Sequence, residues 1–221
     1  MATGVKICGI KSEAALDAAL EAGADYVGLV FFDKSPRNVG LATAGALARR
    51  AHERSRAKVV ALLVDAGDAR IASIAKDVRP DILQLHGHES PERVTDIAKH
   101  TGLTIWKAAP VASADDVAAA SAYFAPGKKA DLILYDAKPP AAGKGALPGG
   151  NGLTFDWRIL DGVKGGHPFA LAGGLTPDNV AEAIRLVEPA VVDVSSGVET
   201  SPGEKSPEQI RRFLQAAKGV K

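Results

Sequence analysis

Short apolar runs alternate with amphipathic segments along most of the chain. The apolar runs are rich in valine, isoleucine and leucine and end in glycine or polar residues, a pattern typical of buried β-strands. The segments between them have helical spacing, and several open on Ser or Thr followed by Pro, as helices often begin. Strands are predicted at 5–10, 26–32, 58–65, 82–87, 103–109, 132–138, 168–175 and 190–198, and helices at 12–23, 90–102, 176–187 and 206–219.

The alternation of strands and helices predicts a parallel sheet, because parallel neighbours need a crossover connection. About eight such units in 221 residues favour a closed parallel sheet wrapped by outer helices, a single (β/α)8 barrel domain over 1–221. An open doubly wound sheet is the alternative, and it is expected to carry a dinucleotide-binding glycine fingerprint. The glycine-rich run at 149–152 follows a loop rather than a strand, so the barrel is the better prediction.

Composition and charge narrow the classes of function. Lys and Arg number 27 against 26 Asp and Glu, with no concentrated basic run, which argues against nucleic acid as a partner. The chain has no apolar run of about 18 residues that could span a membrane, and it does not open on a signal-peptide pattern. Its only cysteine, Cys8, cannot form an internal disulfide. We therefore expect a cytoplasmic protein that acts on a small molecule.

Polar and glycine residues collect where the predicted strands end. A barrel of this kind holds its active site at the carboxyl ends of its strands, so residues far apart in sequence meet there. The candidates at these ends are Cys8, Arg37, Asp65, Gln84, His86, Lys107, Asp136, Gly173, Gly174, Asp193, Ser195, Ser196 and Gly197.

The last two strand ends predict a phosphate site. Gly173 and Gly174 stand between a strand and a helix that opens on Thr-Pro, and Ser195, Ser196 and Gly197 follow the next strand. In such barrels the loops after the seventh and eighth strands commonly bind phosphate through backbone N–H groups. Each motif alone is also explained by a tight turn with a helix cap, but the pair in these positions favours phosphate binding.

Cys8 and Asp136 are the candidates for proton transfer. Asp136 ends an apolar strand, where it is either a general acid or a helix cap or salt-bridge partner of Lys107 or Lys138. Cys8 is either a small buried apolar residue or a thiolate base. Lys6 lies two positions before Cys8, on the same face of the strand, and would favour the thiolate.

His86 and His88 resemble a pair of metal ligands. A metal site needs further ligands, and the other histidines lie in helical or loop segments away from the strand ends. We therefore expect no metal site.

Six motifs give the chain a resemblance to a known family. VKICGI, DYVGLVFFDKSPR, LQLHGHE, GGNGLTFDW, LAGGLTPDNV and VDVSSGVE occur in an order and at a spacing that resemble the phosphoribosylanthranilate isomerases of tryptophan biosynthesis. The resemblance implies an isomerase that carries out the Amadori rearrangement of N-(5-phosphoribosyl)anthranilate to 1-(2-carboxyphenylamino)-1-deoxyribulose 5-phosphate. It implies general acid–base catalysis without cofactor or metal, and it leaves monomer and homodimer open.

The resemblance also implies roles at the matching positions. Cys8 corresponds to the general base and Asp136 to the general acid. Arg37 corresponds to the arginine that binds the anthranilate carboxylate, a task that suits the guanidinium fork. The remaining expected site residues are Gln84, His86 and Asp193 for the substrate, and Gly173, Gly174, Ser195, Ser196 and Gly197 for its phosphate.

The chain departs from the family pattern in three places. Asn38 stands where an aromatic residue is usual, and this can alter how its loop packs. Asp65 replaces a frequent asparagine and is expected to add a negative charge at the mouth. The segment 139–152 is longer than the minimal version, and its glycines suggest a lid.

Other functions remain open on the sequence alone. Indoleglycerol-phosphate synthase, another phosphate-binding barrel enzyme, is expected to need a lysine and a glutamate at strand ends, and here Lys107 has no such glutamate. A sister isomerase of histidine biosynthesis would show paired aspartates, whereas the first strand here ends in Cys8. A non-catalytic barrel that binds sugar phosphates is the third alternative, and an intact acid and base count against it.

Overall fold

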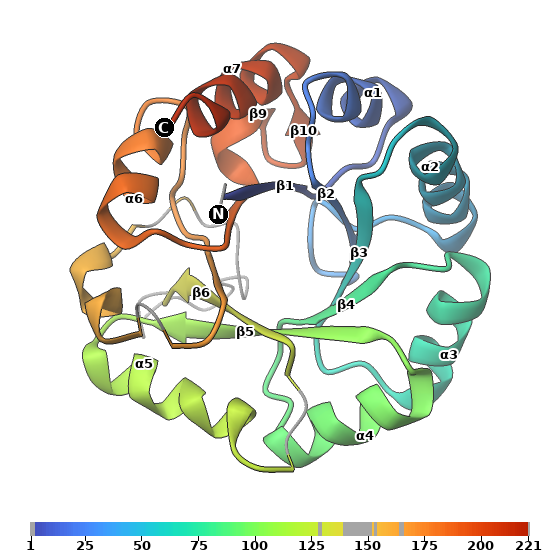
Figure 1. The fold of residues 1–221 in the computed structure, drawn as a ribbon. Helices are drawn as coiled ribbons and strands as arrows, with labels where there is room; N and C mark the ends of the chain where they lie inside the picture. Colours follow the sequence, from blue (N-terminus) through green and yellow to red (C-terminus); the bar gives the residue numbers. More distant parts are fainter. Residues whose placement is uncertain (1–2, 128–129, 139–151, 153, 164–165, 221) are drawn as a thin grey trace.

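Eight parallel strands close into a barrel in the computed structural model, which describes residues 3–127, 130–138, 152, 154–163 and 166–220 (Figure 1). The strands pair in chain order, and β1 pairs with β8 to close the sheet, with Lys6 opposite Asp193. The predicted (β/α)8 architecture is therefore confirmed. The strands are β1 (Gly4–Cys8), β2 (Tyr26–Phe31), β3 (Lys58–Leu63), β4 (Ile82–Leu85), β5 (Thr104–Val111), β6 (Leu132–Ala137), β7 (Phe169–Leu171) and β8 (Val191–Val194).

Helices form a ring outside the strands, as Figure 1 shows. The Ser residues predicted to begin three of them do so, and Ser90, for example, accepts a hydrogen bond from the backbone N–H of Arg93. After β6 the described chain forms a 3-10 helix, η2 (Trp157–Val163), in place of an α-helix. The α-helices are α1 (Glu13–Glu21), α2 (Leu41–Arg54), α3 (Asp68–Asp77), α4 (Pro91–Thr101), α5 (Ala114–Ala120), α6 (Val180–Val187) and α7 (Pro207–Lys218), and η1 (Ser121–Phe124) follows α5.

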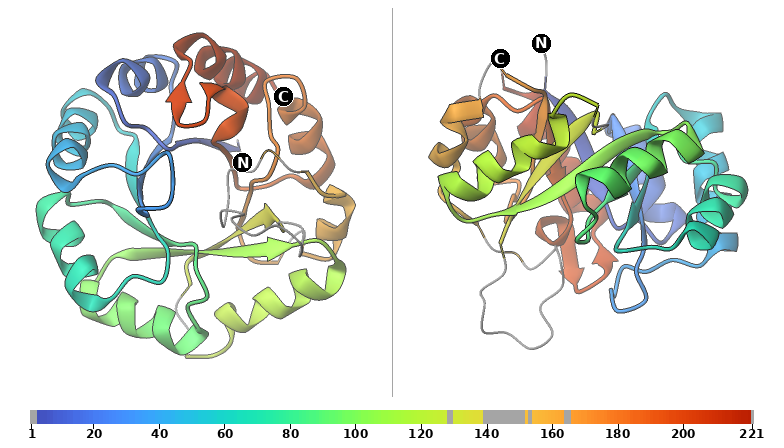
Figure 2. Two further views of the ribbon diagram at one scale, coloured as in Figure 1. Left: turned by 180° about the vertical axis from the view of Figure 1, so that it is seen from behind. Right: turned by 90° about the horizontal axis from the view of Figure 1, so that it is seen from below.

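A small antiparallel hairpin follows β8 and was not predicted. It consists of the 3-10 turn η3 (Ser196–Val198) and two short strands, β9 (Glu199–Ser201) and β10 (Glu204–Lys205). In the side view of Figure 2 this hairpin and the loop after β2 extend from the same end of the barrel. The hairpin therefore adds three charged residues, Glu199, Glu204 and Lys205, near the strand ends, where the active site was expected.

The barrel interior has an apolar layer below a polar one. Alternate side chains of each strand point inward, and a cluster that includes Val60, Trp106 and Leu134 fills the lower part. Lys6 and Gln84 also lie inside the barrel and are fully buried. Within the described ranges, no helix is long and apolar enough to cross a membrane.

Gly28 on β2 makes room for the inward side chains of β1. A Cβ atom at this position would lie 2.8 Å from Sγ of Cys8 and 3.2 Å from Cε of Lys6. The side chains of Lys6 and Cys8 therefore both pack against the backbone of Gly28. The prediction that Lys6 and Cys8 share one face of the first strand is confirmed.

Candidate active site

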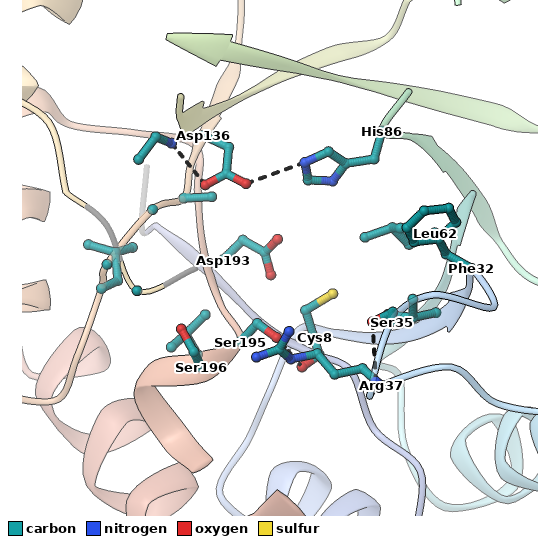
Figure 3. Close-up of a pocket in the computed structure, with 18 of the residues that line it drawn as sticks. Cys8, Phe32, Ser35, Arg37, Leu62, His86, Asp136, Asp193, Ser195 and Ser196 are labelled. Atoms are coloured by element: carbon teal, nitrogen blue, oxygen red, sulfur yellow. Dashed lines mark hydrogen bonds and ion pairs between the residues drawn. The ribbon is translucent and has the colours of Figure 1, made fainter. Parts of the chain in front are cut away.

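A cavity opens at the carboxyl ends of the barrel strands (Figure 3). Its apolar part includes Val30, Phe32, Leu62 and Val64, on or just after β2 and β3. Most of the residues predicted from the strand ends line it, although they come from six separate parts of the chain. The predicted residues that line the cavity are Cys8, Arg37, His86, Asp136, Gly173, Gly174, Asp193, Ser195 and Ser196.

Cys8 ends β1 and lies 3% exposed, packed with Val30 and Leu62. Burial raises the pKa of the Cys8 thiol, and the ammonium of Lys6 lowers it less than burial raises it. Lys6 therefore favours the thiolate, as expected, but burial outweighs its effect on the pKa of Cys8. A raised pKa means that only a small fraction of the thiol is ionised at neutral pH, but the thiolate that forms is a strong base.

Lys6 and Asp193 form an ion pair inside the barrel. Nζ of Lys6 donates to Oδ2 of Asp193 at 2.9 Å, and the lysine side chain is completely buried. Burial opposes the charge of Lys6, but the nearby Asp193 and Cys8 outweigh it, and the pKa of Lys6 is raised. Oδ1 of Asp193 is buried without a hydrogen-bond partner in the part of the chain that the structure describes, and Asp193 lines the cavity. This oxygen is well suited to accept a hydrogen bond from a ligand.

Asp136, the last residue but one of β6, faces His86 in the cavity lining (Figure 3). Its Oδ2 lies 3.3 Å from Nε2 of His86, and its Oδ1 accepts from the backbone N–H of Ala137 at 2.9 Å. Neither of the expected lysine partners takes this carboxylate, since Lys107 and Lys138 pair with Glu89 and Asp116.

Gln84 lies beneath His86 rather than at the cavity wall. Its amide lies 3.2 Å from Nδ1 of His86. This contact helps to fix the imidazole ring, whose Nε2 faces Asp136. Gln84 therefore orients His86, and the direct substrate contact predicted for Gln84 does not match this placement.

Arg37, in the loop after β2, is held by a residue that the sequence analysis missed. Its Nε and Nη2 donate to Oε1 and Oε2 of Glu199, each at 2.8 Å, in a bidentate pair. Nζ of Lys205 donates to the same Glu199 at 2.6 Å and to the backbone oxygen of Ser195 at 2.9 Å. Glu199 and Lys205 lie in the unpredicted hairpin, and only the quoted motif VDVSSGVE gave a signal for Glu199.

The glycines after β7 and β8 allow two loops to pack closely. Gly173 and Gly174 have φ values of 86° and 62°, and a Cβ on Gly173 would lie 2.7 Å from the backbone nitrogen of Ala137. A Cβ on Gly197 would collide with the carbonyl oxygen of Leu175. Gly197 therefore allows the loop after β8 to pack against the loop after β7, and it does not line the cavity.

Lys107 and Asp65 lie at strand ends but hold a loop instead of lining the cavity. Nζ of Lys107 donates to the carbonyl oxygens of Leu85, Gly87 and Ala108 and pairs with Glu89 at 3.1 Å. Asp65 accepts from the backbone N–H of His88. Its expected charge is therefore turned toward the β4–α4 loop rather than toward the cavity. This network fixes the backbone on both sides of His86.

The other two departures from the family pattern have different outcomes. Asn38 donates from Nδ2 to Oδ1 of Asp33 at 3.2 Å, so it closes its own loop with a hydrogen bond. The predicted lid lies almost entirely outside the described residues. Where the chain is described, no group of three or more His, Cys, Asp or Glu is arranged to hold a metal ion.

Comparisons with known proteins agree with one another. The family model for N-(5'phosphoribosyl)anthranilate (PRA) isomerase matches residues 5–216. An N-(5'-phosphoribosyl)anthranilate isomerase of Rhodopseudomonas palustris (strain BisA53) is 53% identical over 221 residues, covering 100% of this chain and 98% of that protein. The phosphoribosyl anthranilate isomerase structure from Thermotoga maritima is 34% identical, with a TM-score of 0.85 and coverage of 99% of this chain and 100% of that chain.

A further solved structure carries a ligand. It is a phosphoribosyl anthranilate isomerase in complex with reduced 1-(o-carboxyphenylamino)-1-deoxyribulose 5-phosphate. It is 32% identical to this chain, with a TM-score of 0.83, and covers 99% of this chain and 100% of that chain. Family model, relatives and solved structures thus match nearly the whole length. The chain belongs to the N-(5'-phosphoribosyl)anthranilate isomerase family and is an isomerase of tryptophan biosynthesis.

Proposed function

We propose that Cys8 is the general base and Asp136 the general acid of the Amadori rearrangement of N-(5'-phosphoribosyl)anthranilate. The observation that supports this most is that a thiol and a carboxyl group from β1 and β6 line one cavity, with an apolar wall beside them. A buried acid and a buried base in one cavity suit a reaction that moves protons between neighbouring atoms of a sugar.

The acid opens the sugar ring. Asp136, protonated, donates to the ring oxygen of the ribose as the bond from C1′ to that oxygen breaks. The lone pair of the anthranilate nitrogen forms the new C1′=N bond, and the result is a protonated Schiff base. Nε2 of His86, 3.3 Å from Oδ2, helps to fix the orientation of the Asp136 carboxyl group at this edge of the cavity.

The base then removes a carbon-bound proton. The thiolate of Cys8 takes the proton on C2′, and the released electron pair forms a C1′=C2′ bond while the C=N electrons return to nitrogen. The enolamine tautomerises as its C2′ hydroxyl loses a proton and C1′ gains one, which gives the ketone. The Schiff base nitrogen accepts the electrons, so the sequence of steps needs no redox partner.

Contacts at both ends of the substrate would hold C2′ near the base. We assign the anthranilate carboxylate to Arg37 and the phosphate to the glycine and serine loops after β7 and β8. Oδ1 of Asp193 is placed for a ribose hydroxyl, since it is buried and lacks a partner among the described residues. Binding that fixes both ends lowers the entropic part of the barrier.

The alternatives receive less support from the site. A lysine–glutamate pair of the kind expected for an indoleglycerol-phosphate synthase exists in Lys107 and Glu89, but both bind loop backbone and neither lines the cavity. A non-catalytic barrel would have no use for a thiol and a carboxyl group in the same cavity.

We also propose a cytoplasmic enzyme with no nucleic-acid partner.

The assembly is either a monomer or a homodimer. One similar solved structure, 34% identical with a TM-score of 0.81, concerns monomers generated from a dimeric phosphoribosylanthranilate isomerase of Thermotoga maritima. Light scattering of the purified chain separates the two states.

The test follows the loss of the substrate's anthranilate fluorescence in wild type, Cys8→Ser and Asp136→Asn. We expect both substitutions to lower kcat by about a hundredfold or more, the usual worth of an acid or base. Circular dichroism and thermal melting check that each variant is folded. Full activity of Cys8→Ser would refute the base assignment, and an inactive wild type would refute the function.

A further inference from the structure

A buried charge cluster lies behind the cavity, where the β9–β10 hairpin meets the loop after β2. It consists of Arg37, Glu199 and Lys205, whose side chains are 6%, 4% and 2% exposed. Only Arg37 of the three lines the cavity. The acid and base steps use none of these charges, so the burial of a glutamate and a lysine here needs its own explanation.

Glu199 holds the guanidinium of Arg37 in a defined orientation. Its two carboxylate oxygens accept from Nε and Nη2 of Arg37, each at 2.8 Å, and a two-bond contact restricts rotation of the guanidinium plane. Burial would raise the pKa of Glu199, but Arg37 and Lys205 outweigh it and hold that pKa below its ordinary range. The glutamate therefore stays charged. Its second oxygen also accepts from the backbone N–H of Gly203, at 3.2 Å, which ties it to the hairpin turn.

Lys205 links this glutamate to the loop expected to bind phosphate. Nζ of Lys205 lies 2.6 Å from Oε1 of Glu199, 2.9 Å from the backbone oxygen of Ser195 and 3.2 Å from its Oγ. Oγ of Ser195 in turn donates to the backbone oxygen of Cys8 at 3.3 Å. A continuous chain of contacts thus runs from Arg37 to Ser195 and on to the end of β1.

We infer that Glu199 and Lys205 are positioning residues that couple the two anion-binding ends of the active site. Glu199 sets the orientation of Arg37, Lys205 sets the position of Ser195, and the short bond between them makes the two loops one unit. The inference rests on the proposed roles of Arg37 and of the phosphate loops. Weakening either member of the pair should disturb binding at both ends, because neither loop is then held against the other.

Glu199→Gln and Lys205→Met test this, with Glu204→Gln as the matched control. Glu204 is a glutamate in the same hairpin and is also paired with a lysine, Lys11 at 3.1 Å, but it is 67% exposed. We expect each of the first two substitutions to raise KM by about ten- to a hundredfold, as loss of a hydrogen bond to a charged group does, with a smaller change in kcat. The control should leave KM unchanged.

Competitive inhibitors report on the two ends separately. Anthranilate probes the Arg37 end and inorganic phosphate probes the Ser195 end. Glu199→Gln and Lys205→Met should each weaken both inhibitors, and the double variant should be no weaker in binding than the worse single variant, because the pair acts as a unit. If Glu199→Gln weakened only anthranilate, or Lys205→Met weakened only phosphate, the two ends would be held independently and the coupling would be overturned.

The outcomes separate this inference from the proposed function. If wild type is active and Glu199→Gln has the same KM and inhibitor affinities as Glu204→Gln, the positioning role is refuted while the function stands. If Glu199→Gln fails to fold because Arg37 and Lys205 are left beside an uncharged amide, the double variant removes one of those charges and supplies the measurement. An unaltered KM in a folded double variant would also overturn the inference.

Discussion

Asp193→Asn should destabilise the protein strongly and reverse how its stability changes with alkaline pH. The substitution keeps the shape of the side chain but removes the charge that pairs with Lys6 at 2.9 Å. Lys6 is completely buried and the Asp193 side chain is 8% exposed, so water cannot replace the lost partner. Breaking a buried pair by removing one member costs about 3–5 kcal/mol of unfolding free energy.

The pH dependence follows from the pKa of Lys6. In the native protein, burial opposes the lysine's charge, but Asp193 and Cys8 outweigh it and the pKa of Lys6 is raised. The stabilisation it gives is therefore complete below the unfolded lysine value of about 10.4 and is lost as pH rises through the folded value. Without the carboxylate, burial prevails and the folded pKa falls below the unfolded one. The unfolded chain then binds more protons, so the stability of the variant should rise with pH below about 10.4.

The assay is urea unfolding of wild type, Asp193→Asn and Lys6→Met/Asp193→Asn between about pH 7 and 11, a range that extends past the unfolded lysine value. The double variant should recover part of the lost stability, because it leaves no unpaired buried cation. Asp178→Asn is the control, since Asp178 pairs with Arg212 at 3.2 Å but is 84% exposed, and it should change little. A loss below about 1 kcal/mol, the range of exposed pairs, with a pH slope like that of wild type would refute a charged buried pair.

Three further predictions concern the acid–base chemistry and its supports. Because burial raises the pKa of Cys8, the thiolate absorbance of this single cysteine should rise with pH up to and beyond the ordinary thiol value of about 8.5, and a plateau well below that value in an ultraviolet titration, with Cys8→Ser as the blank, would contradict the account. Lys107→Met removes three bonds to carbonyl oxygens, two of them on the residues that flank His86, so it should cost about 2–4 kcal/mol in urea unfolding and lower kcat, and an unchanged kcat would show that His86 is held without it. Gly173→Ala should raise KM and cost about 1–3 kcal/mol, since a Cβ would press on Ala137, whereas Gly127→Ala, with φ of 80° and open space, should leave KM unchanged.

The sequence predicted the barrel and the place of its site because both depend on periodic signals. Eight apolar runs predicted the strands, and the rule that barrel sites lie at strand ends placed Cys8, His86, Asp136 and Asp193 in one site from the sequence alone. The face shared by Lys6 and Cys8 follows from the two-residue period of a strand, and it too was correct.

The features that the sequence did not predict depend on which segments become neighbours when the chain folds. Lys6 meets Asp193 only because β1 pairs with β8, so the strand pattern alone could not say that this lysine is committed to a carboxylate. Glu199 and Lys205 lie on strands of three and two residues, too short for a periodic signal. Gln84 is buried below the cavity and does not line it, and the position of a predicted strand end does not tell how deep in the barrel a side chain lies.

The C2′ deuterium isotope effect on kcat/KM, compared in Cys8→Ser and Asp136→Asn, tests most directly whether Cys8 and Asp136 divide the proton transfers as proposed. With the base weakened, removal of the C2′ proton limits the rate and the isotope effect should increase above that of wild type. With the acid weakened, ring opening limits the rate and the isotope effect should fall toward unity. The same isotope effect in both variants would contradict the division, and a reversed order would exchange the roles of Cys8 and Asp136.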